Sequence, residues 1–235
     1  MSAPADARTA RIAANLAAVR ERIAAGCAAA GRDSAEVTLV AVTKTFPAED
    51  VRRLLALGVV DIGENRDQEA RAKAAAVPGA RWHFVGRLQR NKSPSVASYA
   101  ALVHSVDRPE LAVALDAGAR RVGRVPLGVL VQVSLDRDPS RGGAMPSDVP
   151  RLAETVADAA GLRLAGVMAV APLDADPLAA FGRLAEVAAA LRRDHPQATI
   201  VSAGMSGDLE AALRRGATHL RIGTALLGGR TPPVG

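Results

Sequence analysis

The stretch EVTLVAVTKTFPAEDV, residues 36–51, contains one β-strand and the start of one α-helix. Its first half, VTLVAVTK (37–44), is apolar on both faces and rich in β-branched residues, which is typical of a parallel strand covered by helices. Pro47 and the two acidic residues after it open a helical pattern that ends near Gly58. This strand and helix form a unit that the rest of the chain repeats.

Seven more strand-like runs follow the first one. They are VVDIGEN (59–65), RWHFVG (81–86), ALVHSVD (101–107), GVLVQVSL (128–135), LRLAGVMAVA (162–171), TIVSAGMS (199–206) and HLRIGTALL (219–227). Several connections have apolar residues three and four apart, the spacing of an amphipathic helix: 107–121, 147–161, 176–194 and 207–216. Alternating strands and helices indicate βαβ units and a parallel sheet.

Eight such units in 235 residues suit a (β/α)₈ barrel, whose usual length is about 250 residues. The competing fold is an open doubly wound sheet, but no G-x-G-x-x-G motif follows the first strand. We therefore predict an α/β protein with a single TIM-type (β/α)₈ barrel. One domain would span 1–235, with its core at about 37–230 and an extra N-terminal helix over 8–30.

Composition excludes several classes of protein. The single Cys27 cannot form an internal disulfide or a cysteine-rich metal site, and the four histidines lack metal-ligand spacing. No uncharged apolar run reaches the roughly 18 residues of a membrane span, and the first 25 residues do not resemble a signal peptide. We expect a cytoplasmic protein without a metal site.

The basic character of the chain could suggest nucleic acid as a partner. The formal net charge is +6, and the densest basic patch is GRLQRNK, residues 86–92. The other arginines are scattered, and one Trp, one Tyr and three Phe leave few aromatic rings on which bases could stack. We do not expect nucleic-acid binding to be the main function.

Lysine is rare in this chain. Of the 30 basic residues, only Lys44, Lys73 and Lys92 are lysine. Unlike arginine, lysine can lose a proton, and its neutral amine can attack a carbonyl to form an imine. Lys44 at the end of the first strand is therefore a candidate nucleophile. The alternative is a structural ion pair of Lys44 with Glu64 or Asp61.

Active sites of these barrels lie at the carboxyl ends of the strands, and phosphate commonly binds after strands seven and eight. Ser206 and Gly207 begin a predicted helix, where free N–H groups and the helix dipole attract anions, although Ser206 could also be a simple N-cap. Arg221 inside an apolar strand needs partners. The candidate residues at these ends are Lys44, Asn65, Met168, Ser206, Gly207, Arg221, Gly223 and Thr224.

These segments resemble the pyridoxal phosphate homeostasis protein family, whose single-domain members are similar to the barrel half of alanine racemase. The matching stretches are LVAVTKTFP, DIGENRDQEA, WHFVGRLQRNK, HSVDR, GVMAVAP and SAGMSGDLEAALRRGATHLRIGTALLGGR. The resemblance implies that Lys44 carries pyridoxal 5′-phosphate as an internal aldimine and that Arg221 faces the pyridine nitrogen. It also implies phosphate contacts from Ser206, Gly223 and Thr224, and a ring pocket lined by Asn65 and Met168.

The resemblance further implies a bacterial cytoplasmic protein that buffers or delivers the cofactor and affects amino-acid and keto-acid balance, without an established turnover reaction. Its partners would be pyridoxal phosphate and apo forms of enzymes that use it, and we expect a monomer. The alternatives are a weakly active amino-acid racemase and a class I aldolase-type Schiff-base enzyme. Two positions depart from the family pattern: Arg66 replaces a frequent tyrosine, and Arg141 replaces a frequent lysine.

Overall fold

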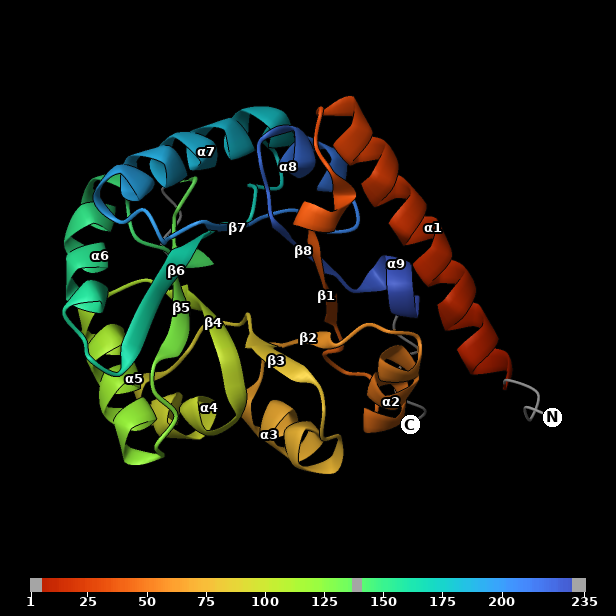
Figure 1. Ribbon diagram of the computed structural model, residues 1–235, viewed down its shortest axis with the longest axis horizontal. Coiled ribbons are helices and arrows are strands. Elements are labelled where there is room, and N and C mark those ends of the chain that lie inside the picture. The colour runs from red at the N-terminus through yellow and green to blue at the C-terminus, as the bar shows by residue number, and fades with distance from the viewer. Residues whose placement is uncertain (1–5, 137–140, 230–235) are drawn as a thin grey trace.

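A computed structural model describes residues 6–136 and 141–229 of the chain. Eight parallel strands close into a barrel in chain order, with β1 paired to both β2 and β8 (Figure 1). This confirms the predicted TIM-type (β/α)₈ fold. The strands are β1 (Thr38–Val42), β2 (Asp61–Glu64), β3 (Arg81–Phe84), β4 (Ala100–Val106), β5 (Leu127–Gln132), β6 (Leu162–Met168), β7 (Ile200–Ser202) and β8 (His219–Ile222).

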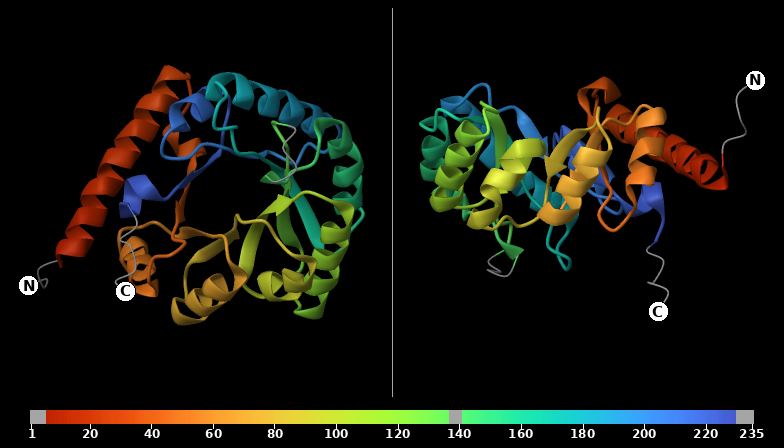
Figure 2. Two further views of the ribbon diagram at one scale, coloured as in Figure 1. Left: turned by 180° about the vertical axis from the view of Figure 1, so that it is seen from behind. Right: turned by 90° about the horizontal axis from the view of Figure 1, so that it is seen from below.

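Helices surround this barrel in both views along its axis (Figures 1 and 2). The predicted N-terminal helix is present as α1 (Ala7–Ala29) and lies outside the barrel beside α8 and α9. The other helices are α2 (Ala48–Ala56), α3 (Asp67–Ala76), α4 (Ser93–Tyr99), α5 (Pro109–Arg121), α6 (Val149–Ala157), α7 (Pro177–Asp194), α8 (Leu209–Arg214) and α9 (Thr224–Leu227). Short 3₁₀ turns cover Ser34–Glu36, Arg90–Lys92 and Pro146–Asp148.

Most strands are shorter than the apolar pattern indicated, and the last two differ most at their C-terminal ends. The last strand ends at Ile222, whereas the prediction extended it to 227, because Leu226 and Leu227 donate their N–H groups to the Gly223 carbonyl and form a helical turn. A short apolar segment has the same composition in a buried helix as in a strand. The seventh strand ends at Ser202, so the residues after it form a loop at the barrel mouth.

The strands separate two cores of different character. Outward residues such as Leu220 and Ile222 join a large apolar cluster with the surrounding helices. Inward residues include a small apolar cluster around Leu130 and Met168, while His219 and Arg221 alternate with the outward pair on β8. The barrel interior is therefore partly polar.

Helix α1 has clear local signals in the sequence. The Asp6 side chain caps it by accepting the Thr9 N–H at 2.7 Å. Its buried residues recur three and four positions apart and pack against the barrel: Ile12, Leu16, Val19 and Ile23. In the part of the chain that the structure describes, no helix is long and apolar enough to cross a membrane. The single-domain boundaries remain a prediction.

Candidate cofactor site

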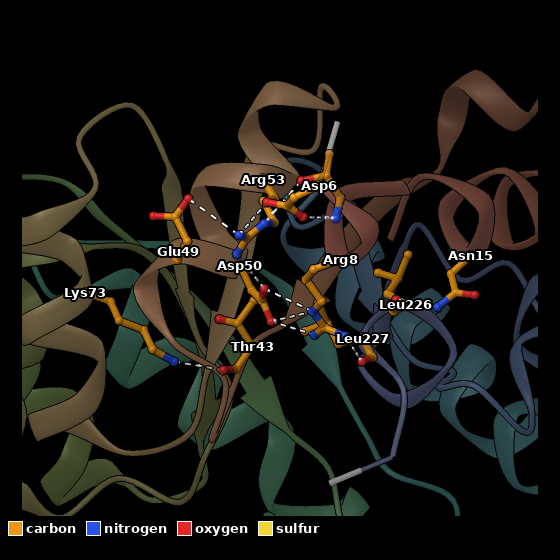
Figure 3. A network of polar contacts seen from close by, with 11 residues as sticks. Asp6, Arg8, Asn15, Thr43, Glu49, Asp50, Arg53, Lys73, Leu226 and Leu227 are labelled. Carbon is orange, nitrogen blue, oxygen red and sulfur yellow. Dashed lines mark hydrogen bonds and ion pairs between the residues drawn. The ribbon is translucent and has the colours of Figure 1, made fainter. Parts of the chain in front are cut away.

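Lys44 lies two residues after the end of β1, in a turn. A buried ion pair between Lys73 and Glu64 stabilises this turn. The Thr43 hydroxyl donates to Glu64 Oε1 at 2.6 Å. Lys73 Nζ donates to the Thr43 carbonyl at 2.8 Å, as Figure 3 shows. Lys73 also bonds Glu64 Oε1 at 2.6 Å. These contacts fix the backbone immediately before Lys44.

The residue after Lys44 is held as well. Thr45 has φ of 70°, which a β-branched side chain rarely adopts. Its N–H donates to Glu69 Oε1 at 2.7 Å, and the same carboxylate oxygen accepts from Lys73 Nζ at 2.6 Å. Glu69 and Lys73 therefore connect both sides of the Lys44 turn to helix α3.

The Lys44 side chain is half-buried and forms no hydrogen bond or ion pair with any other residue that the structure describes. The alternative of a structural ion pair is wrong: Glu64 pairs with Lys73, and Asp61 lies at the opposite end of β2, where it bonds His83. No carboxylate of the described residues therefore pairs with Lys44. Its side chain is left available to a ligand.

The loops after β7 and β8 meet beside Lys44. Because β1 pairs with β8 and β8 with β7, the ends of these three strands are adjacent. The Ser206 hydroxyl accepts the Ala225 N–H at 3.2 Å and joins the two loops. A side chain at Gly223 would place Cβ 3.2 Å from the Val42 carbonyl, so glycine keeps this approach open. We call this region, residues 206–207 and 223–225, the cradle.

The cradle has backbone donors to offer. The N–H groups of Gly207, Gly223 and Thr224 donate to no backbone or side-chain acceptor within residues 6–136 and 141–229. The prediction that Ser206 and Gly207 begin a helix is wrong, because α8 begins at Leu209 and both residues lie in the loop before it. The Asp208 carboxylate turns back to accept the Met205 N–H at 2.5 Å, so the loop uses it internally.

Helix α1 supports the cradle from behind. Arg22 donates to the Ser206 carbonyl at 3.0 Å and pairs with Glu210 at the start of α8. Near the other end of α1, two side chains bind the last carbonyls of α9, as Figure 3 shows: Asn15 Nδ2 to Leu226 O at 2.9 Å and Arg8 to Leu227 O at 3.0 Å. The extra N-terminal helix thus holds both loops of the cradle in place.

Arg221 lies on β8 directly before the cradle and is buried. The sequence indicated that it needs partners, and the structure identifies two: the Ser202 hydroxyl at 2.6 Å and the Ala169 carbonyl at 2.9 Å. Burial lowers the pKa of Arg221 to about 10, which leaves the guanidinium charged at neutral pH. No carboxylate of the described residues contacts it, so its other N–H groups can meet a ligand.

Met168 and Asn65 lie at two further strand ends. Met168 is the last residue of β6 and packs in the interior cluster with Leu102 and Leu130. Asn65 follows β2, and its backbone passes so close to Gly86 that an added Cβ would lie 2.3 Å from the Asn65 carbonyl oxygen. Contacts of Met168 and Asn65 with a cofactor ring remain predictions.

The two departures from the family pattern lie in different surroundings. Arg66 is exposed just before α3. Arg141 donates to the Ala171 carbonyl at 2.7 Å and pairs with Asp136 at 3.0 Å. Arg141 therefore ties the loop after β5 to the loop after β6, whereas a lysine cannot offer the same fork of donors.

These residues fit a ligand that carries both an aldehyde and a phosphate. Within the described residues, the Lys44 amine has no partner, the cradle offers free N–H groups and hydroxyls, and Arg221 is a buried cation that no carboxylate contacts directly. Sequence reasoning missed the supporting residues Ser202 and Lys73. The spacing of Glu69 and Lys73, four apart on one helix, could have indicated part of that support.

Fold and site together define a class: parallel barrels with a lysine at the end of the first strand and an anion cradle after the last two. In agreement, residues 9–231 match the family model described as alanine racemase, N-terminal domain. The pyridoxal phosphate homeostasis protein of Mycobacterium tuberculosis is 46% identical over 237 residues, covering 92% of this chain and 91% of that protein. The Escherichia coli protein of the same name is 37% identical over 227 residues, covering 93% and 97%.

A solved structure supports the same relationship. PipY of Synechococcus elongatus, with pyridoxal phosphate bound, has a TM-score of 0.79 and 34% identity, and the match covers 92% of this chain and 100% of PipY. The chain belongs to the pyridoxal phosphate homeostasis protein family.

Proposed function

We propose that this protein binds pyridoxal 5′-phosphate, with the Lys44 amine bonded to the aldehyde carbon. The observation that carries the proposal is a lysine that has no partner among residues 6–136 and 141–229 and whose turn is held beside a cradle of free N–H groups. The phosphate would be bound by Ser206, Gly207, Gly223 and Thr224, and the ring flanked by Asn65 and Met168. Its support from relatives is the structure of PipY with this cofactor bound.

Arg221 would face the pyridine nitrogen. When bound, the cofactor supplies an electron sink whose strength depends on protonation of that nitrogen. A permanently charged donor at this position disfavours the protonated ring, because two like charges would meet in a buried site. Arg221 therefore favours holding the cofactor over activating it for turnover.

We infer a carrier that stores the cofactor and releases it to apo forms of the enzymes that need it, which would affect amino-acid and keto-acid balance. The name homeostasis protein, carried by the relatives, supports this role. The proposal includes a monomer in the cytoplasm without a turnover reaction of its own. Lys44 in a half-buried position at the barrel mouth supports exchange, since an incoming amine can reach it.

The racemase and aldolase alternatives have less support from the described residues. A two-base racemase needs a second acid/base, but Tyr99, the one tyrosine of the chain, is buried on α4 and donates to Asp67 at 3.3 Å. An aldolase needs carboxylates near its lysine. The two candidates, Glu64 and Asp61, are already bound to Lys73 and His83.

The proposal is tested by adding pyridoxal phosphate to the purified protein, recording the visible spectrum, reducing with borohydride and mapping the modified peptide. The chain has three lysines, Lys44, Lys73 and Lys92, and peptide mapping distinguishes them from one another and from the N-terminal amine. We expect a new absorbance band and one adduct on Lys44. An adduct spread over Lys73 and Lys92, or no band, would reject the proposed site.

The carrier role needs a second experiment. The loaded protein is mixed with the apo form of an enzyme that requires pyridoxal phosphate, and recovery of that enzyme's activity is followed. We expect recovery to be faster than with the same total amount of the protein reduced by borohydride, which cannot release its cofactor. Equal rates would contradict delivery while leaving cofactor binding intact.

A further inference from the structure

A continuous chain of buried polar side chains crosses the barrel interior and ends at Arg221. Asp61 Oδ1 lies 2.9 Å from His83 Nε2, and His83 Nδ1 lies 2.9 Å from His104 Nε2. His104 Nδ1 lies 2.9 Å from the Ser202 hydroxyl, which accepts from Arg221 at 2.6 Å. The strands β4 and β7 are not neighbours, so the contact between His104 and Ser202 spans the interior.

The partners of Ser202 fix the direction of every hydrogen bond in this chain. Arg221 can only donate, so the hydroxyl must accept from it. Ser202 is fully buried, and His104 Nδ1 is the remaining described partner for its proton. His104 must then carry its own proton on Nε2 and donate it to His83 Nδ1. His83 in turn carries its proton on Nε2 and donates it to Asp61.

The electrostatics of the two groups on either side of His83 agree with this arrangement. Complete burial, the neighbouring His83 and the Arg221 charge lower the pKa of His104 well below 6.5, so His104 is neutral. Burial alone would raise the pKa of Asp61, but the hydrogen bond from His83 and the nearby charge of Arg81 outweigh it and lower this pKa. A carboxylate therefore terminates the chain at the far end.

This arrangement solves a problem that a cofactor site imposes on Arg221. A buried guanidinium needs compensation, but a carboxylate in direct contact would compete with the ligand. Burial lowers the pKa of Arg221, and the Asp208 carboxylate acts through space to raise it. In addition, the negative charge of Asp61 is connected to Arg221 through aligned hydrogen bonds, and such bonds polarise one another cooperatively. The guanidinium is thus held by Ser202 and Ala169, while its remaining N–H groups have no acceptor among the described residues.

We propose that Ser202 and His104 are positioning residues that fix the orientation of Arg221 toward the cofactor ring, with His83 and Asp61 completing the chain. The inference rests on the proposed function, since it assigns a ring-facing role to Arg221. It predicts that the chain is already formed without the cofactor. It also predicts that losing one bond in it changes the state of the cofactor ring without removing the cofactor.

The first test uses the cofactor-free protein and needs no variant. Nitrogen NMR of ¹⁵N-labelled histidine distinguishes protonated from unprotonated ring nitrogens near neutral pH. We expect both His83 and His104 to carry a proton on Nε2 and none on Nδ1. A proton on Nδ1 of either residue would overturn the chain direction, whatever the protein binds.

The second test compares Ser202→Ala with His219→Gln, loaded with pyridoxal phosphate labelled with ¹⁵N in its ring. His219 is the matched control because it lies in the same interior, with its ring centre 6.2 Å from that of His83, but bonds Thr218 outside the chain. In Ser202→Ala we expect the ring nitrogen to shift toward its protonated signal and the affinity to fall about tenfold, as for loss of one hydrogen bond to a charged group.

The outcomes separate the two proposals. Wild-type protein that takes up no pyridoxal phosphate would reject the proposed function, while the histidine measurement would still report on the chain. Wild-type protein that binds the cofactor, with a Ser202→Ala signal unchanged from it, would overturn the positioning role. An equal shift in His219→Gln would also overturn it, because any change in the interior would then have the same effect.

Discussion

Lys44 and Lys73 lie on either side of one turn and have opposite surroundings. Lys73 is buried and bonds Glu64, Glu69 and the Thr43 carbonyl. Lys44 is half-buried and has none of these partners. The two side chains are chemically identical, so any difference in their reactivity comes from their surroundings. The fold gives hydrogen-bond and ion-pair partners to Lys73 and not to Lys44. Lys73 occupies the nearby carboxylates and leaves Lys44 without a counter-ion.

The largest expected effect follows from replacing Lys44 with alanine. Since Lys44 is the lysine beside the cradle, Lys44→Ala should abolish covalent binding of pyridoxal phosphate at this site. Stability should change by less than about 0.5 kcal/mol, because the side chain has no described partner. A spectral titration and urea unfolding of the cofactor-free protein measure the two effects. Lys92→Ala, at an exposed lysine, is the control and should bind normally.

A variant that keeps the charge makes this first test sharper. Lys44→Arg retains a cation at the barrel mouth but cannot form the covalent bond. We expect it to behave like Lys44→Ala in the titration. Normal formation of the visible band in Lys44→Arg would place the reacting amine elsewhere and would remove the contrast between the two lysines.

The next largest effect is on folding. Lys73→Met removes the cation that compensates Glu64 and should lower the free energy of unfolding by about 3 kcal/mol, the usual cost of breaking a buried ion pair. Urea unfolding of the cofactor-free protein measures it. Adding Glu64→Gln to Lys73→Met should restore most of the loss, because no buried charge is then left alone. A Lys73→Met protein as stable as wild type would contradict the structural role.

The sequence pattern was enough to predict the barrel, because strand and helix alternate from residue 37 onward. Helices α3 and α4 were missed because their segments are short and weakly amphipathic. The end of β8 was predicted too late, since the segment TALL (224–227) has no polar residue after its first position to indicate a turn. Local patterns therefore fixed the order of elements better than their ends.

The candidate site was predicted less completely, for a physical reason. Lys44, Arg221 and the cradle lie at strand ends, and the barrel topology brings strand ends together. The sequence does not show which lysine pairs with Glu64, because Lys44 and Lys73 are both candidates from their positions in the sequence. Only the direction in which α3 packs decides between them. The chain from Asp61 to Arg221 was missed because its residues come from five different strands.

A smaller effect concerns the pH dependence of stability. Burial raises the pKa of Glu64 above 4.5, although the hydrogen bonds from Lys73 and Thr43 act in the opposite direction. A carboxyl with a raised folded-state pKa contributes stability that is fully present below pH 4.5 and is lost as the pH rises through the folded-state value. The stability of wild type relative to Glu64→Gln should therefore decrease with rising pH in that window.

Urea unfolding of wild type and Glu64→Gln across this pH range measures the difference. Subtracting the two curves removes the contributions of the other titrating groups, which both proteins share. A difference that increases with pH would mean that the ion pair with Lys73 lowers the pKa of Glu64. Lys73 would then be a stronger partner than its geometry with two carboxylates and one carbonyl indicates.

The smallest effect tests the turn that carries Lys44. Thr45 adopts φ of 70°, which costs a residue with a Cβ roughly 1–2 kcal/mol relative to ordinary backbone. Glycine relieves this cost but gains freedom in the unfolded chain, so Thr45→Gly should be more stable than Thr45→Ala by less than about 1 kcal/mol. Thermal unfolding of both cofactor-free variants measures it. If Thr45→Ala proved the more stable, the turn would not be strained, and the bond from Thr45 N–H to Glu69 would hold a relaxed backbone. The local backbone conformation alone would then determine the position of Lys44. The hydrogen bonds and ion pairs of Lys73 would contribute to stability but not to that position.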